Sequence, residues 1–189
     1  MIMGLEKLIE LAGKIENEEL RKKTIEILKD IKLTHPEFQS YERENPENVR
    51  TPFIVNDTVG IRELIIHTTV VTEACIKIAE LIEKRLGVKV DKDVLIAGAL
   101  LHDIMKVYEF KNGKPTGILL DHSALALAEL YKRDFPQEVL HLVISHAAPS
   151  TNPPRTLEAV ILHYVDSLFA LVEFGISQSL KKEEEKEKK

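Results

Sequence analysis

An uninterrupted apolar run from Val94 to Leu101 constrains the fold of this chain more than any other feature. Apolar residues at helical spacing continue after it, and Asp91 stands shortly before it, where an acidic side chain commonly caps a helix. A helix that is apolar on every side is stable only when other elements cover it completely. The sequence therefore predicts a central, buried helix over residues 92–110.

Helical spacing of apolar residues also dominates the rest of the chain. Gly87 is expected to end a long helix as its C′ residue. Because no alternating strand pattern and no phosphate-binding glycine loop is found, the predicted fold class is all-α. The spacing predicts a helical hairpin or one kinked helix over residues 5–31, and further helices over residues 61–86, 120–133, 136–147 and 155–174.

Proline-rich and charged segments separate these helices. Residues 34–60 are expected to form an extended connector, which is unusual in a compact domain unless the connector covers a site. Residues 111–115 are predicted as a turn, residues 148–154 as a loop, and the charged run at residues 181–189 as solvated or disordered. We therefore expect three parts: an N-terminal helical hairpin with its connector (1–50), a main helical domain (51–175) and a charged tail (176–189).

The chain has 189 residues, a formal net charge of −5 and one cysteine, Cys75. This composition is typical of one soluble globular domain, and a single cysteine excludes a disulfide framework or a cysteine-based zinc cluster. Net acidity argues against a nucleic-acid coat protein, which needs a basic surface. The apolar stretches stop short of the ~20 residues of a membrane span, and the N-terminus does not resemble a signal peptide. We expect a cytoplasmic location and no membrane contact.

Several histidines and two aspartates lie in apolar helical surroundings: His67, His102, Asp103, His146 and Asp166. Buried imidazoles and carboxylates need partners, and this combination points to a metal ion. Nitrogen and oxygen ligands of this kind bind Mn, Fe, Co, Ni, Zn or Mg ions. Neighbouring helical residues point about 100° apart. His102 and Asp103 can therefore share one ion only at a helix end, unless Asp103 bridges two ions.

The ordered pattern of His67, His102-Asp103 and Asp166 resembles the defining H…HD…D signature of the HD superfamily of metal-dependent phosphohydrolases. The likeness is closer still to the HD domain of the YhaM-type 3′-5′ exoribonucleases, and it spans roughly residues 49–172. It rests on further similar segments at residues 91–101, 107–110, 119–122, 144–146 and 158–166. The resemblance implies an HD-domain helical bundle, here with an N-terminal helical extension.

The resemblance also implies roles for single residues. Lys106 is similar to the lysine that such members place near the substrate phosphate, so Asp103 and Lys106 are the expected catalytic residues. His163 and Arg155 are candidates for contacting the substrate. The implied ligands are His67, His102, Asp103 and Asp166 for a first ion, and His122 and His146, bridged through Asp103, for a second. There are two alternatives. One is a polar network without metal, and the other is a one-metal site in which His122 and His146 bind no ion.

The implied function is a metal-dependent phosphohydrolase. It would use a metal-bound hydroxide to hydrolyse a phosphomonoester or phosphodiester of a nucleotide or oligonucleotide, including single-stranded RNA ends. One or two divalent ions are the implied cofactor. The alternatives are an HD-type di-iron oxygenase and a non-catalytic regulatory module that binds metal or nucleotide. The amphipathic N-terminal segment also suggests a homo-oligomer.

Overall fold

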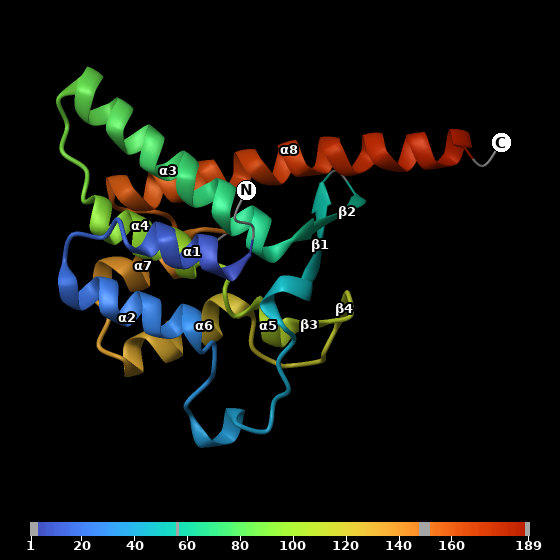
Figure 1. Ribbon diagram of the computed structural model, residues 1–189, viewed down its shortest axis with the longest axis horizontal. Coiled ribbons are helices and arrows are strands. Elements are labelled where there is room, and N and C mark those ends of the chain that lie inside the picture. The colour runs from blue at the N-terminus through green and yellow to red at the C-terminus, as the bar shows by residue number, and fades with distance from the viewer. Residues whose placement is uncertain (1–3, 56, 148–151, 188–189) are drawn as a thin grey trace.

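The computed structural model describes residues 4–55, 57–147 and 152–187, with side chains described as far as residue 179. Helices make up most of this part of the chain, and two short antiparallel hairpins accompany them (Figure 1). The elements are α1 (Leu5–Ala12), α2 (Glu18–Lys29), η1 (Pro36–Phe38), η2 (Pro46–Asn48), β1 (Arg50–Val55), β2 (Thr58–Glu63), α3 (Leu64–Leu86), α4 (Lys92–Leu101), α5 (Lys106–Glu109), β3 (Phe110–Lys111), β4 (Lys114–Pro115), α6 (His122–Lys132), α7 (Gln137–Ser145) and α8 (Leu157–Glu187).

Helix α4 is the centre of the molecule, as its all-apolar sequence predicts. All of its residues from Val94 to Leu101 are buried, and α1, α2, α3, α7 and α8 pack around it. The N-terminal helices share this core, because Leu8 and Leu28 are fully buried in the same apolar cluster as Leu95. The predicted break between residues 13 and 17 is confirmed, and it separates two distinct helices.

The predicted helix ends are largely confirmed. Gly87 ends α3 in the left-handed conformation, with φ of 67°. The Asp91 side chain accepts a hydrogen bond from the backbone N–H of Val94 and so caps α4. Pro136 directly precedes α7. These short-range signals act within one turn of the chain and therefore survive in the folded structure.

The expectation of a chain without strands is wrong in two places. Residues 50–63, expected to be connector and the start of a helix, form the hairpin β1–β2, so α3 begins at Leu64 rather than at residue 61. The predicted turn at residues 111–115 closes the hairpin β3–β4, with Asn112 and Gly113 both at positive φ. Such a two-residue turn suits the twist of paired strands.

Two helix lengths also differ from the prediction. The helix expected over residues 92–110 ends at Leu101, and after a turn the short α5 follows. Helix α8 continues to Glu187, through most of the run expected to be solvated or disordered. Part of the predicted loop at 148–154 lies outside the described residues. In Figure 1 the C-terminal part of α8 extends past the helical body, with the hairpin β1–β2 beneath it.

By length and composition alone, α8 could cross a membrane over Leu157–Ser179, which corrects the expectation that every apolar stretch is too short. Only 28% of its most apolar window is buried inside the molecule. This is weak evidence for a span, because a core helix passes the same test. The same stretch contains the buried Asp166 and packs against α3, α4 and α7.

Candidate metal centre

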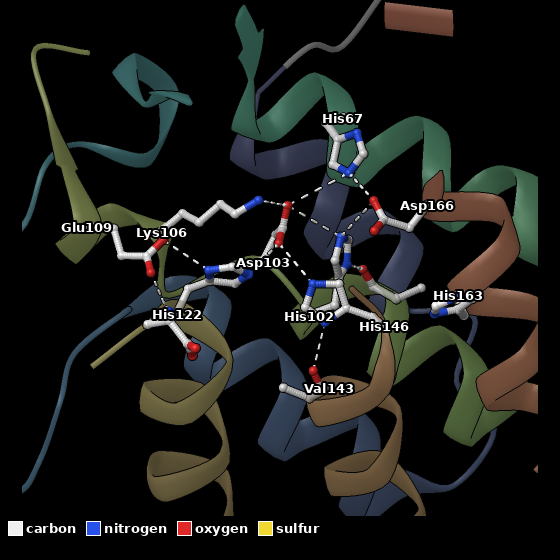
Figure 2. Close-up of polar contacts among 12 residues, drawn as sticks. His67, His102, Asp103, Lys106, Glu109, His122, Val143, His146, His163 and Asp166 are labelled. Carbon is white, nitrogen blue, oxygen red and sulfur yellow. Dashed lines mark hydrogen bonds and ion pairs between the residues drawn. The ribbon is translucent and has the colours of Figure 1, made fainter. Parts of the chain in front are cut away.

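Six histidine and aspartate side chains from five separate regions converge at one buried place (Figure 2). His67 lies on α3 and Asp166 on α8. His102 and His146 each follow the last residue of a helix, α4 and α7, and His122 is the first residue of α6. Asp103 lies in the turn after His102. Because α4 ends there, both neighbours can face the same centre, which an unbroken helix would prevent.

Two of the histidines are oriented by the ends of their own helices. The Nδ1 atom of His102 lies 2.7 Å from the carbonyl oxygen of Ala99, and that of His146 lies 2.7 Å from the carbonyl oxygen of Val143. A carbonyl oxygen can only accept a hydrogen bond, so each Nδ1 atom must carry the proton. When the ring is neutral, as a metal ligand must be, its lone pair is therefore on Nε2.

The other two histidines are oriented by glutamates. The Nδ1 atom of His122 lies 2.9 Å from Glu109, which also accepts the backbone N–H of His122. The Nδ1 atom of His67 lies 3.0 Å from Glu173 on α8. A carboxylate behind a histidine fixes the tautomer and raises the basicity of the ring as a ligand. All four rings thus have an acceptor at Nδ1.

The two oxygens of Asp103 face different histidines. Its Oδ1 atom lies 3.2 Å from Nε2 of His122 and 3.4 Å from Nε2 of His146. Its Oδ2 atom lies 3.5 Å from Nε2 of His102 and 3.7 Å from Nε2 of His67. One carboxylate therefore lies between two groups of histidines, an arrangement that suits a bridge between two ions.

Asp166 completes the group around Oδ2 of Asp103. Its Oδ1 atom lies 2.9 Å from Nε2 of His67 and 4.0 Å from Nε2 of His102. One ligand atom from each of His67, His102 and Asp166 lies within 4.8 Å of the others, and the same holds for His102, Asp103 and His146. Each group is compact enough to hold one cation.

Two positive side chains contact the aspartates. The Lys106 ammonium donates to Oδ2 of Asp103 at 2.7 Å (Figure 2). The Arg62 guanidinium donates to the same oxygen at 3.2 Å and lies 3.6 Å from Asp166. Both cations are almost completely buried, so their interactions with the carboxylates are only weakly screened by solvent.

These charges keep the acids ionised. Burial opposes the charged form of Asp103, but Lys106, His102 and Arg62 outweigh it and hold its pKa well below the usual range. Burial likewise disfavours the Asp166 carboxylate, and the hydrogen bond from His67 with the charge of His102 reverses that effect, so its pKa is also lowered. Both aspartates are therefore anionic at neutral pH.

His146 differs from His67 and His122 in the direction of its pKa shift. Burial lowers the pKa of His146 and keeps its ring neutral, as a metal ligand must be. Burial also works against protonated His67 and His122, but the carboxylates around them raise both pKa values. In the metal-free protein, a proton on Nε2 of His67 bridges to Asp166.

Unpaired polar atoms provide the test of whether a metal ion fits. Nε2 of His102, Nε2 of His122 and Oδ1 of Asp103 are buried without a hydrogen-bond partner. Such atoms are destabilising unless another partner satisfies them. All three point into the same cluster and are nitrogen or oxygen donors suited to a divalent cation. The residues present therefore fit a metal ion.

The other predicted residues lie at different distances from the cluster. Lys106 is part of it. His163 is adjacent, since its Nδ1 atom lies 3.1 Å from the carbonyl oxygen of Ser145, the neighbour of His146. The backbone N–H of Arg155 donates to His141, and no contact recorded within the described residues joins its exposed side chain to the cluster.

Three residues of the cluster were not predicted: Arg62, Glu109 and Glu173. Glu109 lies in a segment that resembles the exoribonucleases, so a search for carboxylates behind the ligands could have found it. Arg62 and Glu173 gave no signal, because a strand that was not predicted and the far part of α8 bring them to the site.

Comparison with known proteins identifies the family. The HD domain model matches residues 65–171, more than half of the chain. No solved structure matches the chain significantly. All six histidine and aspartate side chains of the cluster, and Lys106, lie within the matched residues.

The chain is 44% identical to a dihydroneopterin 2′,3′-cyclic phosphate phosphodiesterase of Methanocaldococcus jannaschii, over 86% of this chain and 67% of that protein. It is 39% identical to the 3′-5′ exoribonuclease YhaM of Bacillus subtilis over 97 residues, which are 42% of this chain and 31% of that protein. It is 37% identical to the 3′-5′ exoribonuclease YhaM of Bacillus licheniformis over 99 residues, which are 43% of this chain and 32% of that protein.

These relatives confirm the predicted similarity to the exoribonucleases, and the phosphodiesterase matches over a longer part of the chain with higher identity. Both kinds of relative are named for hydrolysing phosphate diesters. They favour the predicted hydrolase over the alternatives of an oxygenase or a non-catalytic module. The chain belongs to the HD-domain superfamily of metal-dependent phosphohydrolases.

Proposed function

We propose that the cluster holds two divalent ions that share Asp103. His67, His102 and Asp166 with Oδ2 of Asp103 form the first set of ligands, and His122 and His146 with Oδ1 form the second. The opposed directions of the two Asp103 oxygens carry this assignment. The Nε2 nitrogen of His122 supports the second set, since it is buried and makes no hydrogen bond even though it lies 3.2 Å from Oδ1 of Asp103.

The substrate that fits this chain best is a small cyclic phosphodiester, such as a 2′,3′-cyclic phosphate on a ribose-like group. The relative named for such a substrate matches 86% of the chain. In the reaction, a bond forms between phosphorus and a water oxygen, and one ester bond to phosphorus breaks. The water gives one proton to the released hydroxyl group, and the product is a phosphomonoester.

When bound, divalent ions lower the pKa of water from ~15.7 toward neutrality and polarise phosphoryl oxygens. The protein's own side chains have separate tasks. Asp103, ionised at neutral pH, can accept a hydrogen bond from the attacking water and orient it. The buried Lys106 ammonium lies beside Asp103, where it can stabilise the negative charge that gathers on the phosphoryl oxygens in the transition state. His163 is the nearest candidate for a contact with the rest of the substrate.

The assay uses protein loaded separately with Mn²⁺, Co²⁺ and Ni²⁺ and offered a 2′,3′-cyclic nucleotide, a linear diester and a phosphomonoester. We expect the cyclic diester to be hydrolysed with the highest kcat/KM. Asp103→Asn should remove at least about 10³-fold of this activity, while the exposed Asp134→Asn should retain it. Hydrolysis of the monoester alone, or full activity in Asp103→Asn, would contradict the proposal.

Hydrolysis of single-stranded RNA ends is the second candidate. It rests on the match to the exoribonucleases, which covers the catalytic region but only about a third of those proteins. A short 5′-labelled RNA, incubated with the Mn²⁺ form, separates the two candidates. Stepwise shortening at a rate comparable with cyclic diester hydrolysis would favour the exoribonuclease.

We further propose a divalent metal cofactor, a cytoplasmic location and a homo-oligomer. Metal analysis of protein purified without chelator would give the ion and its stoichiometry among Mn, Fe, Co, Ni, Zn and Mg. A cytoplasmic location is proposed as the default for a globular chain of this composition. A homo-oligomer would cover exposed apolar side chains of α8, among them Leu168, Leu171 and Ile176. Light scattering of the purified protein tests this.

A further inference from the structure

Arg62 occupies an unusual position for a positive side chain. Its guanidinium lies within 4 Å of three carboxylates, those of Asp103, Asp166 and Glu173, and 3.4 Å from Nδ1 of His67. An arginine is always protonated and has no lone pair to offer, so it cannot be a ligand of a cation. It nevertheless lies among the groups best suited to hold one. Its interactions are therefore with anions, which in this structure are the three carboxylates.

The hairpin β1–β2 is built to hold Arg62 at this place. The Phe53 ring lies 5.4 Å from the Arg62 guanidinium and contacts Phe174 of α8 edge-on at 6.4 Å. Gly60, paired with Phe53 across the hairpin, lets this packing occur, because a Cβ atom there would lie 2.7 Å from the Phe53 ring and 3.2 Å from Phe174. The aromatic contacts fix the hairpin to α8 and support the guanidinium from one side.

Arg62 and Lys106 approach the same atom from different elements. Both donate to Oδ2 of Asp103, one from β2 and one from α5. An anion beside Asp103 would therefore find an ammonium and a planar guanidinium within reach of one phosphate group. The two NH₂ groups of the guanidinium face Asp103 and Asp166 here, and the same planar pair of donors has the geometry that binds phosphate oxygens in pairs.

Charge balance favours an anionic ligand over a purely internal role. The centre contains four carboxylates (Asp103, Asp166, Glu109 and Glu173) and two permanent cations (Lys106 and Arg62), a surplus of two negative charges when the histidines are neutral. One divalent ion would cancel this surplus. A second would leave two excess positive charges, and the single negative charge of a bound phosphodiester would reduce this excess to one.

We propose that Arg62 binds the phosphate of the substrate, opposite Lys106, and that the hairpin β1–β2 with the adjoining part of α8 is the element that presents it. This role rests on the proposed phosphodiesterase function. Arg62 and Glu173 both lie outside the residues 65–171 that match the HD domain model. Arg62 is thus supplied by a segment that precedes the matched domain, and the Glu173 carboxylate beside it by a segment that follows that domain.

The test compares Arg62→Ala and Arg62→Lys with Arg50→Ala, a matched control whose exposed guanidinium pairs with Glu63 on the same hairpin. Binding of inorganic phosphate to the Mn²⁺-loaded proteins is measured by calorimetry, alongside bound Mn²⁺ and the melting temperature. Steady-state kinetics on a cyclic diester follow. We expect Arg62→Ala to weaken phosphate binding and raise KM about 10- to 100-fold, with a smaller change in kcat and unchanged Mn²⁺ content.

Arg62→Lys keeps the charge but loses the planar pair of donors, so its phosphate affinity should lie between those of the wild type and Arg62→Ala. Arg50→Ala should match the wild type. If Arg62→Ala or Arg62→Lys loses Mn²⁺ or thermal stability while phosphate affinity of the loaded protein is unchanged, Arg62 only balances internal charge and the proposal fails. Phosphate binding is measured without turnover, so its result does not depend on whether the diester is a substrate.

Discussion

Substitutions of Glu109 and Glu173 can weaken the two proposed ion sites one at a time. Glu109 lies beside Nδ1 of His122, and Glu173 lies beside Nδ1 of His67. Replacing the carboxylate by an amide keeps the size but removes the charge that makes the imidazole a better ligand. Loss of such a supporting carboxylate typically weakens metal affinity ~10–100-fold.

We therefore predict that Glu109→Gln weakens binding of one Mn²⁺ ion and that Glu173→Gln weakens binding of the other. Calorimetric titration of the metal-free protein, with metal analysis of the products, measures both. Glu80→Gln is the control, because Glu80 is exposed and pairs only with Lys77 on α3. A single binding event weakened equally by both substitutions would show that the centre holds one ion.

His141 gives a prediction about pH at a distance from the metal centre. Its Nε2 atom accepts the backbone N–H of Arg155 at 2.9 Å, which requires a neutral ring. Partial burial, followed by the charge of Arg155, lowers its pKa. A lowered pKa in the folded state means that this contact contributes stability above the unfolded value of ~6.5 and loses it as the pH falls through the folded value.

An NMR titration of the histidine rings should accordingly give His141 a midpoint below 6.5, the ordinary value for its ring. The midpoint should move upward in Arg155→Ala, since that substitution removes the positive charge but leaves the backbone donor in place. A midpoint at or above the ordinary value in the wild type would mean that the ring does not accept this hydrogen bond in solution.

At the level of elements, the contact between α4 and α7 sets the distance between His102 and His146, because each histidine follows the end of one of these helices. Gly98 permits the close approach. A Cβ atom there would lie 2.5 Å from Cδ2 and 2.9 Å from Cβ of Leu142. The second of these atoms is next to the backbone and cannot move without moving α7.

Gly98→Ala should therefore destabilise the protein, although alanine is intrinsically better in a helix by ~1 kcal/mol. Overpacking a core typically opposes folding by ~1–3 kcal/mol, so we expect a net loss of about 1 kcal/mol. Gly175→Ala is the matched control: Gly175 is helical and exposed, with open space around its missing Cβ, and its substitution should be stabilising. Denaturant unfolding measures both, and equal signs would contradict the packing argument.

The elements show what the sequence could predict and what it could not. Helices were predictable because their apolar spacing is local, and α4 was predicted as central because nothing polar interrupts it. The hairpin β1–β2 was missed because its apolar residues do not mark the buried face: in β2, Val59 and Ile61 are exposed while Gly60 is buried. In addition, Pro52 and Gly60 are unfavourable in most strands. The early end of α4 was missed because His102 and Asp103 continue a helical pattern that the turn then breaks.

The site residues follow the same division. His67, His102, Asp103 and Asp166 were assigned from their order along the chain and their likeness to a known signature, and the structure brings them together. Arg62 and Glu173 depend on how the hairpin and the far part of α8 pack against each other. That packing is set by Phe53, Gly60 and Phe174, whose contacts no local pattern encodes.

For the whole molecule, the candidate metal centre connects elements that are distant in sequence. The proposed ligands come from α3, from the turn after α4, from α6, from the end of α7 and from α8, and all of these elements contribute residues to the apolar core. An ion that binds the folded arrangement and not the unfolded chain must stabilise the entire fold, because the ligands separate on unfolding.

We predict that saturating Mn²⁺ raises the melting temperature of the metal-free protein and that a chelator reverses the change. At a free concentration 100 times the Kd, binding contributes ~2.7 kcal/mol. For a chain of this length, ~2–4 °C per kcal/mol then corresponds to a rise of about 5–11 °C. Asp103→Asn should abolish most of this rise, since both proposed sets of ligands lose their shared carboxylate, whereas Asp134→Asn should keep it. Asp134 is the appropriate control because it is exposed and has a φ of 54°, which asparagine adopts equally well. A full rise in Asp103→Asn would place the stabilising ion elsewhere on the molecule and would separate the buried cluster from metal binding.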